Sequence, residues 1–261
     1  MREGVDSMAR TNKAYGWVPD LPDHRDFLYS SPPEISVRLP KKVDLTPHCP
    51  PVYDQGQLGS CTGNGVAGVL QFDALKESLA DTSTPSRLFI YYNERVLEGT
   101  VASDSGAMIR DGIKSVASTG VCDETTWPYD IARFAETPPA ACFTEAARHR
   151  AIQYSRVPQS LNQMKGCLAS GYPIVFGFTV YESFESPAVA ATGVVPMPAI
   201  AEKVLGGHCV VAVGYNDTTS RFIIRNSWGT GWGKKGYATM PYTYLMSDSL
   251  ARDFWTVRST S

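Results

Sequence analysis

The sequence predicts an α+β protein with two lobes, because helical patterns come first along the chain and β-rich runs come second. Apolar residues recur at helical spacing over 60–79 and again over 108–120. After about residue 150 they gather in short runs rich in Val, Ile and Phe. We therefore expect a mainly helical lobe over about 55–150 and a mainly β lobe over about 151–245.

The N-terminal segment, residues 1–39, is expected to be extended and to pack on the rest of the chain, residues 40–261. Prolines occupy five of the first 40 positions, and closely spaced prolines interrupt helices. A disordered tail has little need of large apolar side chains. This segment carries several that require a surface to cover them: Trp17, Leu21, Phe27, Leu28 and Tyr29.

The first helix is expected to begin at Ser60, a residue type that caps helix N-termini. Its apolar face is wide and its first charge comes at Asp73, so this helix should be buried. Gly63 and Gly65 are poor helix formers in its first turns, and they predict that another part of the chain approaches closely there. The second helix should end at Gly120.

The β lobe should contain four short strands separated by turns. The expected strands are 173–180, 208–214, 221–225 and 236–240, and the residues at 216–220 form a turn between the second and the third.

The hairpin around that turn gathers three side chains of chemical interest at one end of the sheet. If residue 215 pairs with residue 221, His208 faces Trp228 and Asn226 lies nearby. An amide in that place suits the orientation of an imidazole, and Trp228 would shield the bond between them from water.

Cys61, at the start of the first helix, is the candidate nucleophile. A thiol attacks an acyl carbon as the thiolate, and a helix N-terminus favours that anion. His208 supplies a base and Asn226 an amide that orients it. Gln55 precedes Cys61 by six residues, and its side chain, together with the Cys61 backbone N–H, could donate to the oxyanion formed in acyl transfer. These parts indicate a cysteine peptidase.

Four motifs in this order resemble the papain family of cysteine peptidases, with weaker similarity over roughly 43–240. The motifs are QGQLGSCT at 55–62, WPY at 127–129, GHCVVAVGY at 207–215 and NSWGTGWGKKGY at 226–237. The resemblance implies a papain-like two-lobe fold, with a helical left lobe, a β-barrel-like right lobe and the active site in the cleft between them. Its spacing also matches the roles given above to Gln55 and Cys61.

Two positions depart from the family pattern. Leu58 stands where these enzymes usually have a cysteine three residues before the nucleophile, so that disulfide is absent here. Thr62 replaces the usual tryptophan after the nucleophile. Neither change touches the expected catalytic atoms.

The resemblance also suggests how substrate is bound. The backbone of Gly106 would pair with an extended peptide, which reads main chain rather than sequence. Met108, Gly206 and Cys209 would line a pocket for the second residue before the cleaved bond, and such a pocket should accept apolar side chains. The residues expected on the substrate side are Gly59, Ser105, Gly106, Met108, Gly206, Gly207, Cys209 and Trp228.

The N-terminal segment differs from the pro-segments usual in papain-like enzymes. Papain-like enzymes are usually kept inactive, as zymogens, by a long pro-segment with a helical unit, which about 40 proline-rich residues cannot form. We predict instead that the segment covers part of the cleft, anchored by large side chains such as Trp17 and Tyr29, and that its displacement or cleavage regulates the enzyme. The alternative is a permanent strap that only stabilises the fold.

The catalytic groups and the resemblance imply peptide or protein substrates, and composition points to no other partner. A net charge of −2 gives no electrostatic reason to expect nucleic acid or an anionic membrane. No apolar run reaches the roughly 18 residues of a membrane span. The first residues lack the apolar core of a signal peptide, which leaves a cytoplasmic location or export by another route.

The six cysteines do not suggest a disulfide framework, because a free nucleophile leaves an odd number. Cys122 and Cys142 flank the WPY motif and are the candidates for one disulfide. The chain has no Cys-x-x-Cys and its four histidines are scattered, so we expect no metal and no cofactor.

Two alternatives to a peptidase remain open. The same groups could serve peptide ligation or another acyl transfer, which differs only in the acceptor. The chain could also be a peptide-binding module without activity, although such a module has no need of all four catalytic groups.

Overall fold

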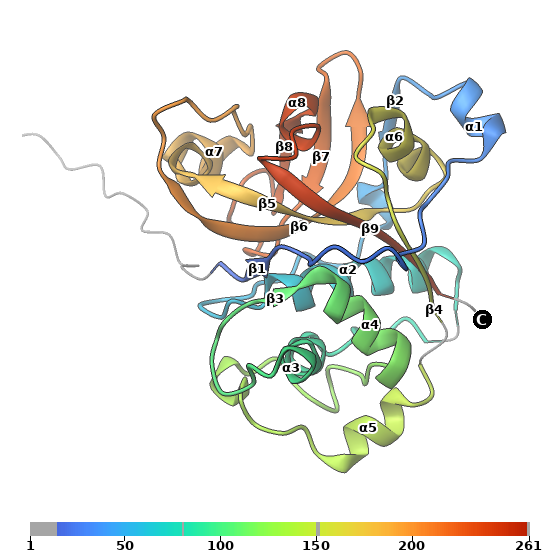
Figure 1. The fold of residues 1–261 in the computed structure, drawn as a ribbon, viewed down its shortest axis with the longest axis vertical. Coiled ribbons are helices and arrows are strands. Elements are labelled where there is room, and N and C mark those ends of the chain that lie inside the picture. The colour runs from blue at the N-terminus through green and yellow to red at the C-terminus, as the bar shows by residue number, and fades with distance from the viewer. Residues whose placement is uncertain (1–14, 80, 150–151, 260–261) are drawn as a thin grey trace, which may run out of the picture.

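The computed structural model describes residues 15–79, 81–149 and 152–259, and residues 1–14 of the predicted N-terminal segment lie outside this range. Figure 1 shows a sheet-bearing half above and a helical half below, with α2 between them. The helices are α1 (Pro33–Val37), α2 (Cys61–Lys76), α3 (Arg87–Glu98), α4 (Ile109–Thr119), α5 (Ala140–Ala146), α6 (Leu161–Ala169), α7 (Pro187–Thr192) and α8 (Tyr242–Leu245). The strands are β1 (Trp17–Val18), β2 (Lys42–Asp44), β3 (Ala107–Met108), β4 (Ile152–Arg156), β5 (Ile174–Tyr181), β6 (Val204–Asn216), β7 (Arg221–Arg225), β8 (Tyr237–Pro241) and β9 (Ala251–Ser259).

Helix α2 is the buried helix that the sequence predicts. Residues 61–73 are all buried. Close packing explains the two glycines of its first turns: a Cβ atom on Gly63 would lie 2.8 Å from the Arg87 carbonyl oxygen, and one on Gly65 would lie 2.9 Å from the Cys209 sulfur. Any larger residue would push the helical half and the sheet apart at the start of α2.

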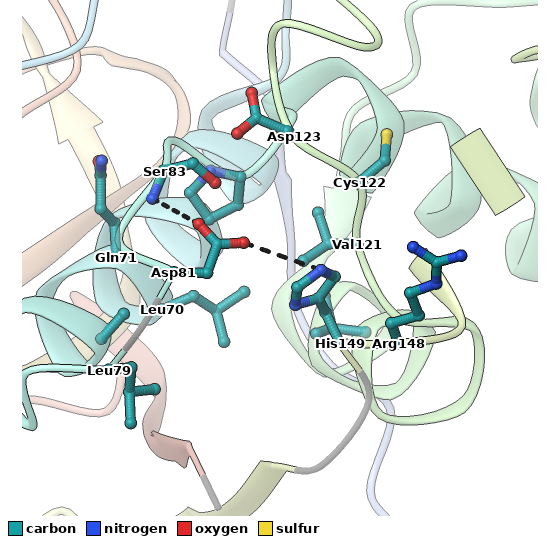
Figure 2. Close-up of a pocket in the computed structure, with 13 residues that line it drawn as sticks. Leu70, Gln71, Leu79, Asp81, Ser83, Val121, Cys122, Asp123, Arg148 and His149 are labelled. Atoms are coloured by element: carbon teal, nitrogen blue, oxygen red, sulfur yellow. Dashed lines mark hydrogen bonds and ion pairs between the residues drawn. The ribbon is translucent and has the colours of Figure 1, made fainter. Parts of the chain in front are cut away.

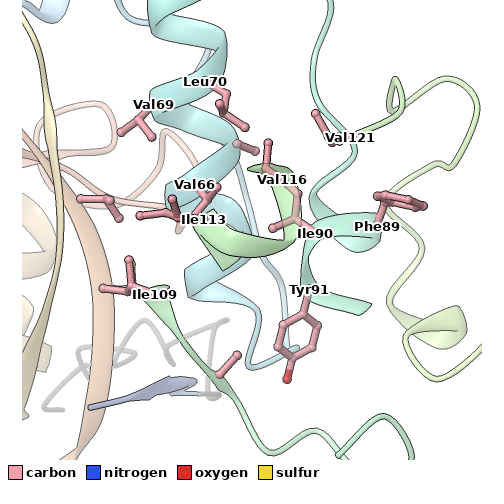
Figure 3. Close-up of a cluster of buried hydrophobic side chains, with 14 of the residues drawn as sticks. Val66, Val69, Leu70, Phe89, Ile90, Tyr91, Ile109, Ile113, Val116 and Val121 are labelled. Atoms are coloured by element: carbon pink, nitrogen blue, oxygen red, sulfur yellow. The ribbon is translucent and has the colours of Figure 1, made fainter. Parts of the chain in front are cut away.

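The helical half packs on α2 through apolar side chains from three helices. Figure 3 shows Val66 and Val69 of α2 beside Ile113 of α4, with Ile90 of α3 further along the same cluster. Helix α4 ends at Gly120, in the left-handed region with φ of +89°, as its sequence predicts. Helix α3 was not predicted from the sequence.

The β half contains one open sheet and not a closed barrel, so the β-barrel-like lobe of the sequence prediction is corrected. Its strands are ordered β4-β9-β5-β6-β7-β8, and β2 pairs with β6. The four predicted strands are present as β5, β6, β7 and β8. Strand β9, at the C-terminal end of the chain, lies between β4 and β5 and was not predicted.

The hairpin of β6 and β7 has a register that differs from the assumed one at its turn. Tyr215 pairs with Phe222, and not with residue 221. A bulge between Ala212 and Gly214 then absorbs one residue, so that Val211 pairs with Arg225. Beyond the bulge the pairing is therefore the one predicted, and it directs His208 toward the residues that follow β7.

The N-terminal segment runs between the two halves, where β1 pairs in parallel with β3 (Figure 1). Trp17 and Tyr29 are buried, as expected. The expectation is wrong for Leu21, Phe27 and Leu28, which are 68%, 73% and 70% exposed. The segment is anchored instead by ion pairs and hydrogen bonds. One ion pair joins Asp26 to Arg110 on α4 at a distance of 2.6 Å.

Candidate active site

Cys61 is the first residue of α2 and is fully buried. Burial raises the pKa of its thiol to about 12. Hydrogen bonds from the backbones of Cys209 and Gly16 oppose that rise without cancelling it. The contact with Gly16 means that the N-terminal segment reaches the candidate nucleophile itself.

His208 and Asn226 are brought together at the end of the hairpin. The His208 Nε2 atom lies 2.8 Å from the Asn226 Oδ1 atom, and neither residue is exposed to more than 1%. The Trp228 ring stacks on the imidazole with a centroid distance of 4.8 Å and an interplanar angle of 30°. The hydrogen bond is therefore shielded from water, as the sequence suggested.

Gln55 is fixed by hydrogen bonds of its backbone and side chain on the loop before α2. Its backbone N–H donates to the Ser227 carbonyl oxygen (2.9 Å), and its Nε2 atom donates to the Leu58 carbonyl oxygen (2.9 Å). The Ser227 hydroxyl donates to its Oε1 atom (2.7 Å). These bonds set the orientation of the side-chain amide and tie it to the residue after Asn226.

The expected substrate-side residues of the helical half border the N-terminal segment. Gly106 has φ of +73°, a conformation that favours glycine, and a Cβ atom there would lie 2.3 Å from the Gly16 carbonyl oxygen. Gly59 donates its N–H to the Asp104 carboxylate at 3.0 Å and faces Gly16. Met108 pairs with Val18, and the Ser105 hydroxyl donates to the Gly106 carbonyl oxygen.

The expected substrate-side residues Gly206 and Gly207 of β6 border the same segment. A Cβ atom on Gly206 would lie 2.7 Å from the Tyr15 ring, and one on Gly207 would lie 2.5 Å from the Trp17 carbonyl oxygen. Cys209 is different, because its sulfur lies against Gly65 of α2 in the core.

Residues 15–18 therefore occupy the space between Cys61 and the end of the hairpin. The Gly16 carbonyl oxygen accepts a hydrogen bond of 2.7 Å from the Ala107 N–H. The Tyr15 ring meets the His208 ring edge-on, with a centroid distance of 6.3 Å. Peptide substrate and this part of the chain cannot both lie there.

Two carboxylates, Asp20 and Asp253, anchor the segment just beyond the cleft, and neither was predicted from the sequence. Asp253 of β9 accepts the Trp17 indole N–H (3.2 Å) and the Asp20 backbone N–H (2.8 Å). Asp20 in turn accepts the Trp255 indole N–H (2.8 Å) and the Arg110 backbone N–H (3.1 Å). Burial is the main cause that raises the pKa of both carboxyls.

All six cysteines are free thiols, so Cys122 and Cys142 do not form the disulfide considered above. Both are buried, and burial raises the pKa of each. Within the described residues, no group of three or more His, Cys, Asp or Glu side chains is placed to hold a metal ion. Over the same part of the chain, no helix is long and apolar enough to cross a membrane.

A separate cavity of about 170 Å³ lies beside the C-terminal half of α2, whereas Cys61 begins that helix. Figure 2 shows Asp81 there, between Ser83 and His149. The His149 and Asp81 side chains are 3.8 Å apart and both are exposed. Such a pair is an ordinary surface contact and contains none of the chemistry described above.

The fold and this site define the class of protein. Residues 39–246 match the family described as "Papain family cysteine protease". The chain belongs to the papain family of cysteine proteases, and its class of reaction is hydrolysis.

Individual relatives agree with this assignment. The chain is 43% identical to xylellain, a cysteine protease from Xylella fastidiosa, with a TM-score of 0.90 over 97% of this chain and 98% of that one. It is 40% identical to an uncharacterized peptidase C1-like protein of Acanthamoeba polyphaga mimivirus, over 96% of this chain and 88% of the viral protein. Chicken (Gallus gallus) cathepsin K is 26% identical over 80% of this chain, which spans 60% of the length of that cathepsin.

Proposed function

We propose that the chain is an endopeptidase in which Cys61 is the nucleophile and His208 is the general base. Asn226 orients the imidazole, and the Gln55 amide and the Cys61 backbone N–H stabilise the oxyanion. The observation that carries the proposal is the buried 2.8 Å bond between His208 and Asn226 beneath the Trp228 ring. Because Nε2 is engaged by the amide, Nδ1 is the nitrogen that exchanges a proton with the thiol.

The reaction then proceeds in two halves. The thiol gives its proton to His208, and the thiolate attacks the carbonyl carbon of the scissile bond while the two donors stabilise the oxyanion. The C–N bond breaks as His208 returns the proton to the leaving amine, which leaves a thioester on Cys61. Water gives a proton to His208 and attacks the thioester, and the thiolate departs from the carboxylic product.

The N-terminal segment is proposed to be an autoinhibitory cover, so that residues 1–39 regulate the peptidase domain of residues 40–261. Three contacts support this: Gly16 touches the thiol, the Tyr15 ring meets the His208 ring edge-on, and Trp17 lies against Gly207. Peptides gain access when the segment is displaced or cleaved.

Product analysis distinguishes the peptidase from its alternatives. The full chain and Cys61→Ala are each mixed with a fluorogenic peptide ester, and the products are weighed by mass spectrometry. A burst of leaving group that is absent in Cys61→Ala, followed by a free carboxylic acid, supports hydrolysis. A product joined to an added amine would indicate ligation. The absence of any burst, even in a Trp17→Ala form whose cover is loosened, would indicate a binding module.

Deletion of residues 1–38 distinguishes a cover from a permanent strap. A shortened chain that stays folded and cleaves peptides faster supports the cover. A shortened chain that unfolds, or that folds with unchanged activity, rejects it.

A further inference from the structure

The third residue of the WPY motif lies beneath the loop that joins Gln55 to Cys61, called here the oxyanion loop (residues 55–60). The Tyr129 hydroxyl donates to the Gln55 carbonyl oxygen at 2.9 Å. It also lies 2.5 Å from the Ser60 Oγ atom. One hydroxyl thus bonds the first and the last residue of the loop.

The directions of these hydrogen bonds follow from the atoms involved. A carbonyl oxygen only accepts, so the single Tyr129 proton goes to Gln55 and the Ser60 hydroxyl donates to Tyr129. Ser60 Oγ accepts in turn from the Asn64 Nδ2 atom at 3.1 Å. The Asn64 Oδ1 atom accepts from the Arg87 Nη1 atom at 3.1 Å. The chain of bonds runs in one direction, from a cation to the oxyanion loop.

The cation that begins this chain is itself fixed. Arg87 makes two hydrogen bonds to the Glu124 carboxylate, of 2.7 and 2.6 Å. Its guanidinium lies 3.9 Å from the centre of the Tyr129 ring, and it donates to the Asp54 carbonyl oxygen at 3.2 Å. Burial raises the pKa of Tyr129 to about 12, so the phenol retains its proton at neutral pH. A network with satisfied members of this kind is rigid.

We propose that Tyr129 is a positioning residue for the oxyanion site, and this inference rests on the proposed function of Cys61 and Gln55. Bonds from Ser227 and to Leu58 fix the rotation of the Gln55 amide within the loop. They do not reach Ser60, which directly precedes the Cys61 N–H at the start of α2. The Tyr129 hydroxyl joins the two ends of the loop, because it bonds both Gln55 and Ser60. It thereby sets the spacing between the two donors that must meet one oxygen atom.

Tyr129→Phe tests this, since it removes the hydroxyl and retains the ring beneath Arg87. We expect kcat to fall about 10-fold with KM within about twofold, because donors to the transition state are displaced while peptide binding is not. Affinity for a peptide aldehyde, whose adduct places an oxygen in the same site, should fall by the same factor. The rate of Cys61 alkylation by iodoacetamide should stay within about twofold, because that reaction creates no oxyanion.

Each measurement is made on the full chain and on the same chain with Trp17→Ala. Each variant is compared with the parent that carries the same residue at position 17, so that any difference in cleft opening cancels. Tyr244→Phe is the matched control: it also removes a buried hydroxyl that donates to a backbone carbonyl, that of Thr179 at 2.7 Å. It should lower stability similarly and leave kcat unchanged. If Tyr129→Phe does not fold, Ser60→Ala serves, with a smaller fall in kcat and unchanged alkylation.

A kcat for Tyr129→Phe, or for Ser60→Ala in its place, that equals that of the parent protein would overturn the inference. So would parallel losses in turnover and in alkylation, which would place the defect at the thiol. If the parent chain and its Trp17→Ala form cleave no peptide at all, the proposed peptidase function fails instead. In that case the affinity for the peptide aldehyde and the alkylation rate of Cys61 still test the role of Tyr129, because neither measurement requires turnover.

Discussion

The Trp17 indole donates a hydrogen bond of 3.2 Å to the Asp253 carboxylate, across 236 residues of sequence. Asp253 has φ of +58°, a left-handed conformation that is unfavourable for a residue other than glycine. Its carboxylate also accepts from the Asp20 N–H (2.8 Å) and from Arg156 Nη2 (2.9 Å). A strained residue of β9 is thus directed at the N-terminal segment, beside the cleft that the segment covers.

Asp253→Ala should therefore weaken the cover. The change leaves the Trp17 and Asp20 donors without their acceptor, and a hydrogen bond to a charged group contributes about 1.5–3 kcal/mol. We expect the initial rate of cleavage of a fluorogenic peptide to rise at least about 10-fold. Asp248→Ala, at an exposed carboxylate shortly before β9, is the control and should match the wild type. Equal rates in all three proteins would show that Asp253 does not hold the segment.

The cover should loosen as pH rises. Burial, and after it the Asp253 carboxylate, raises the pKa of Asp20 from 3.8 to about 7 in the packed state. A carboxyl with a raised pKa favours packing fully below its unpacked value, near pH 4, and this contribution is lost as pH rises through about 7. A hydrogen bond from the Arg110 backbone and the charge of Arg110 oppose this rise in the Asp20 pKa without cancelling it.

Asp20→Asn tests the sign, because an amide stands in for the protonated acid. The Cys61 alkylation rates of the variant and the wild type should differ less at pH 5.5 than at pH 8, because the contribution of Asp20 is lost progressively between about pH 4 and 7. At pH 8 the wild type should react several-fold faster than the variant, since only its cover has loosened. A faster variant at pH 8 would mean that the sign is wrong.

His208→Ala should lower kcat more than Asn226→Ala does. Removal of the base should lower kcat by about 10²–10⁴-fold. Removal of the amide only leaves the imidazole less well oriented, so we expect a fall of about 10-fold with KM nearly unchanged. Steady-state kinetics with one peptide substrate measures both, and a larger loss in Asn226→Ala would reverse the roles assigned here.

Local patterns explain what could be predicted from the sequence. Helix α2 follows from its apolar spacing, although the Ser60 side chain makes no capping bond, and the hairpin that joins His208 to Asn226 follows from two β-rich runs around a turn. The bulge between Ala212 and Gly214 could not be predicted from the sequence. It nevertheless restores the predicted pairing on the side of the hairpin that contains His208.

Contacts between distant segments explain what was missed. Nothing local distinguishes Trp17, which is buried, from Leu21, which is exposed, because the difference lies in Asp253 on a strand at the other end of the chain. The same holds for Tyr129, whose partner Gln55 lies 74 residues away. The WPY motif that contains Tyr129 could be recognised in the sequence, but its contact with the oxyanion loop could not be predicted.

The alkylation rate of Cys61 tests the central claim most directly, namely that the chain covers its own reactive thiol. The full chain, Trp17→Ala and Leu21→Ala are treated briefly with iodoacetamide at neutral pH, and each of the six cysteines is followed by mass spectrometry. Loss of a buried side chain worth about 1.5–3 kcal/mol should speed the labelling of Cys61 by about 10-fold or more in Trp17→Ala. Leu21→Ala, at a 68% exposed position, should react like the wild type, and the other five thiols should stay slow in all three proteins. A Cys61 that reacts equally in wild type and Trp17→Ala, or no faster in Trp17→Ala than Cys167 or Cys209, would contradict the account.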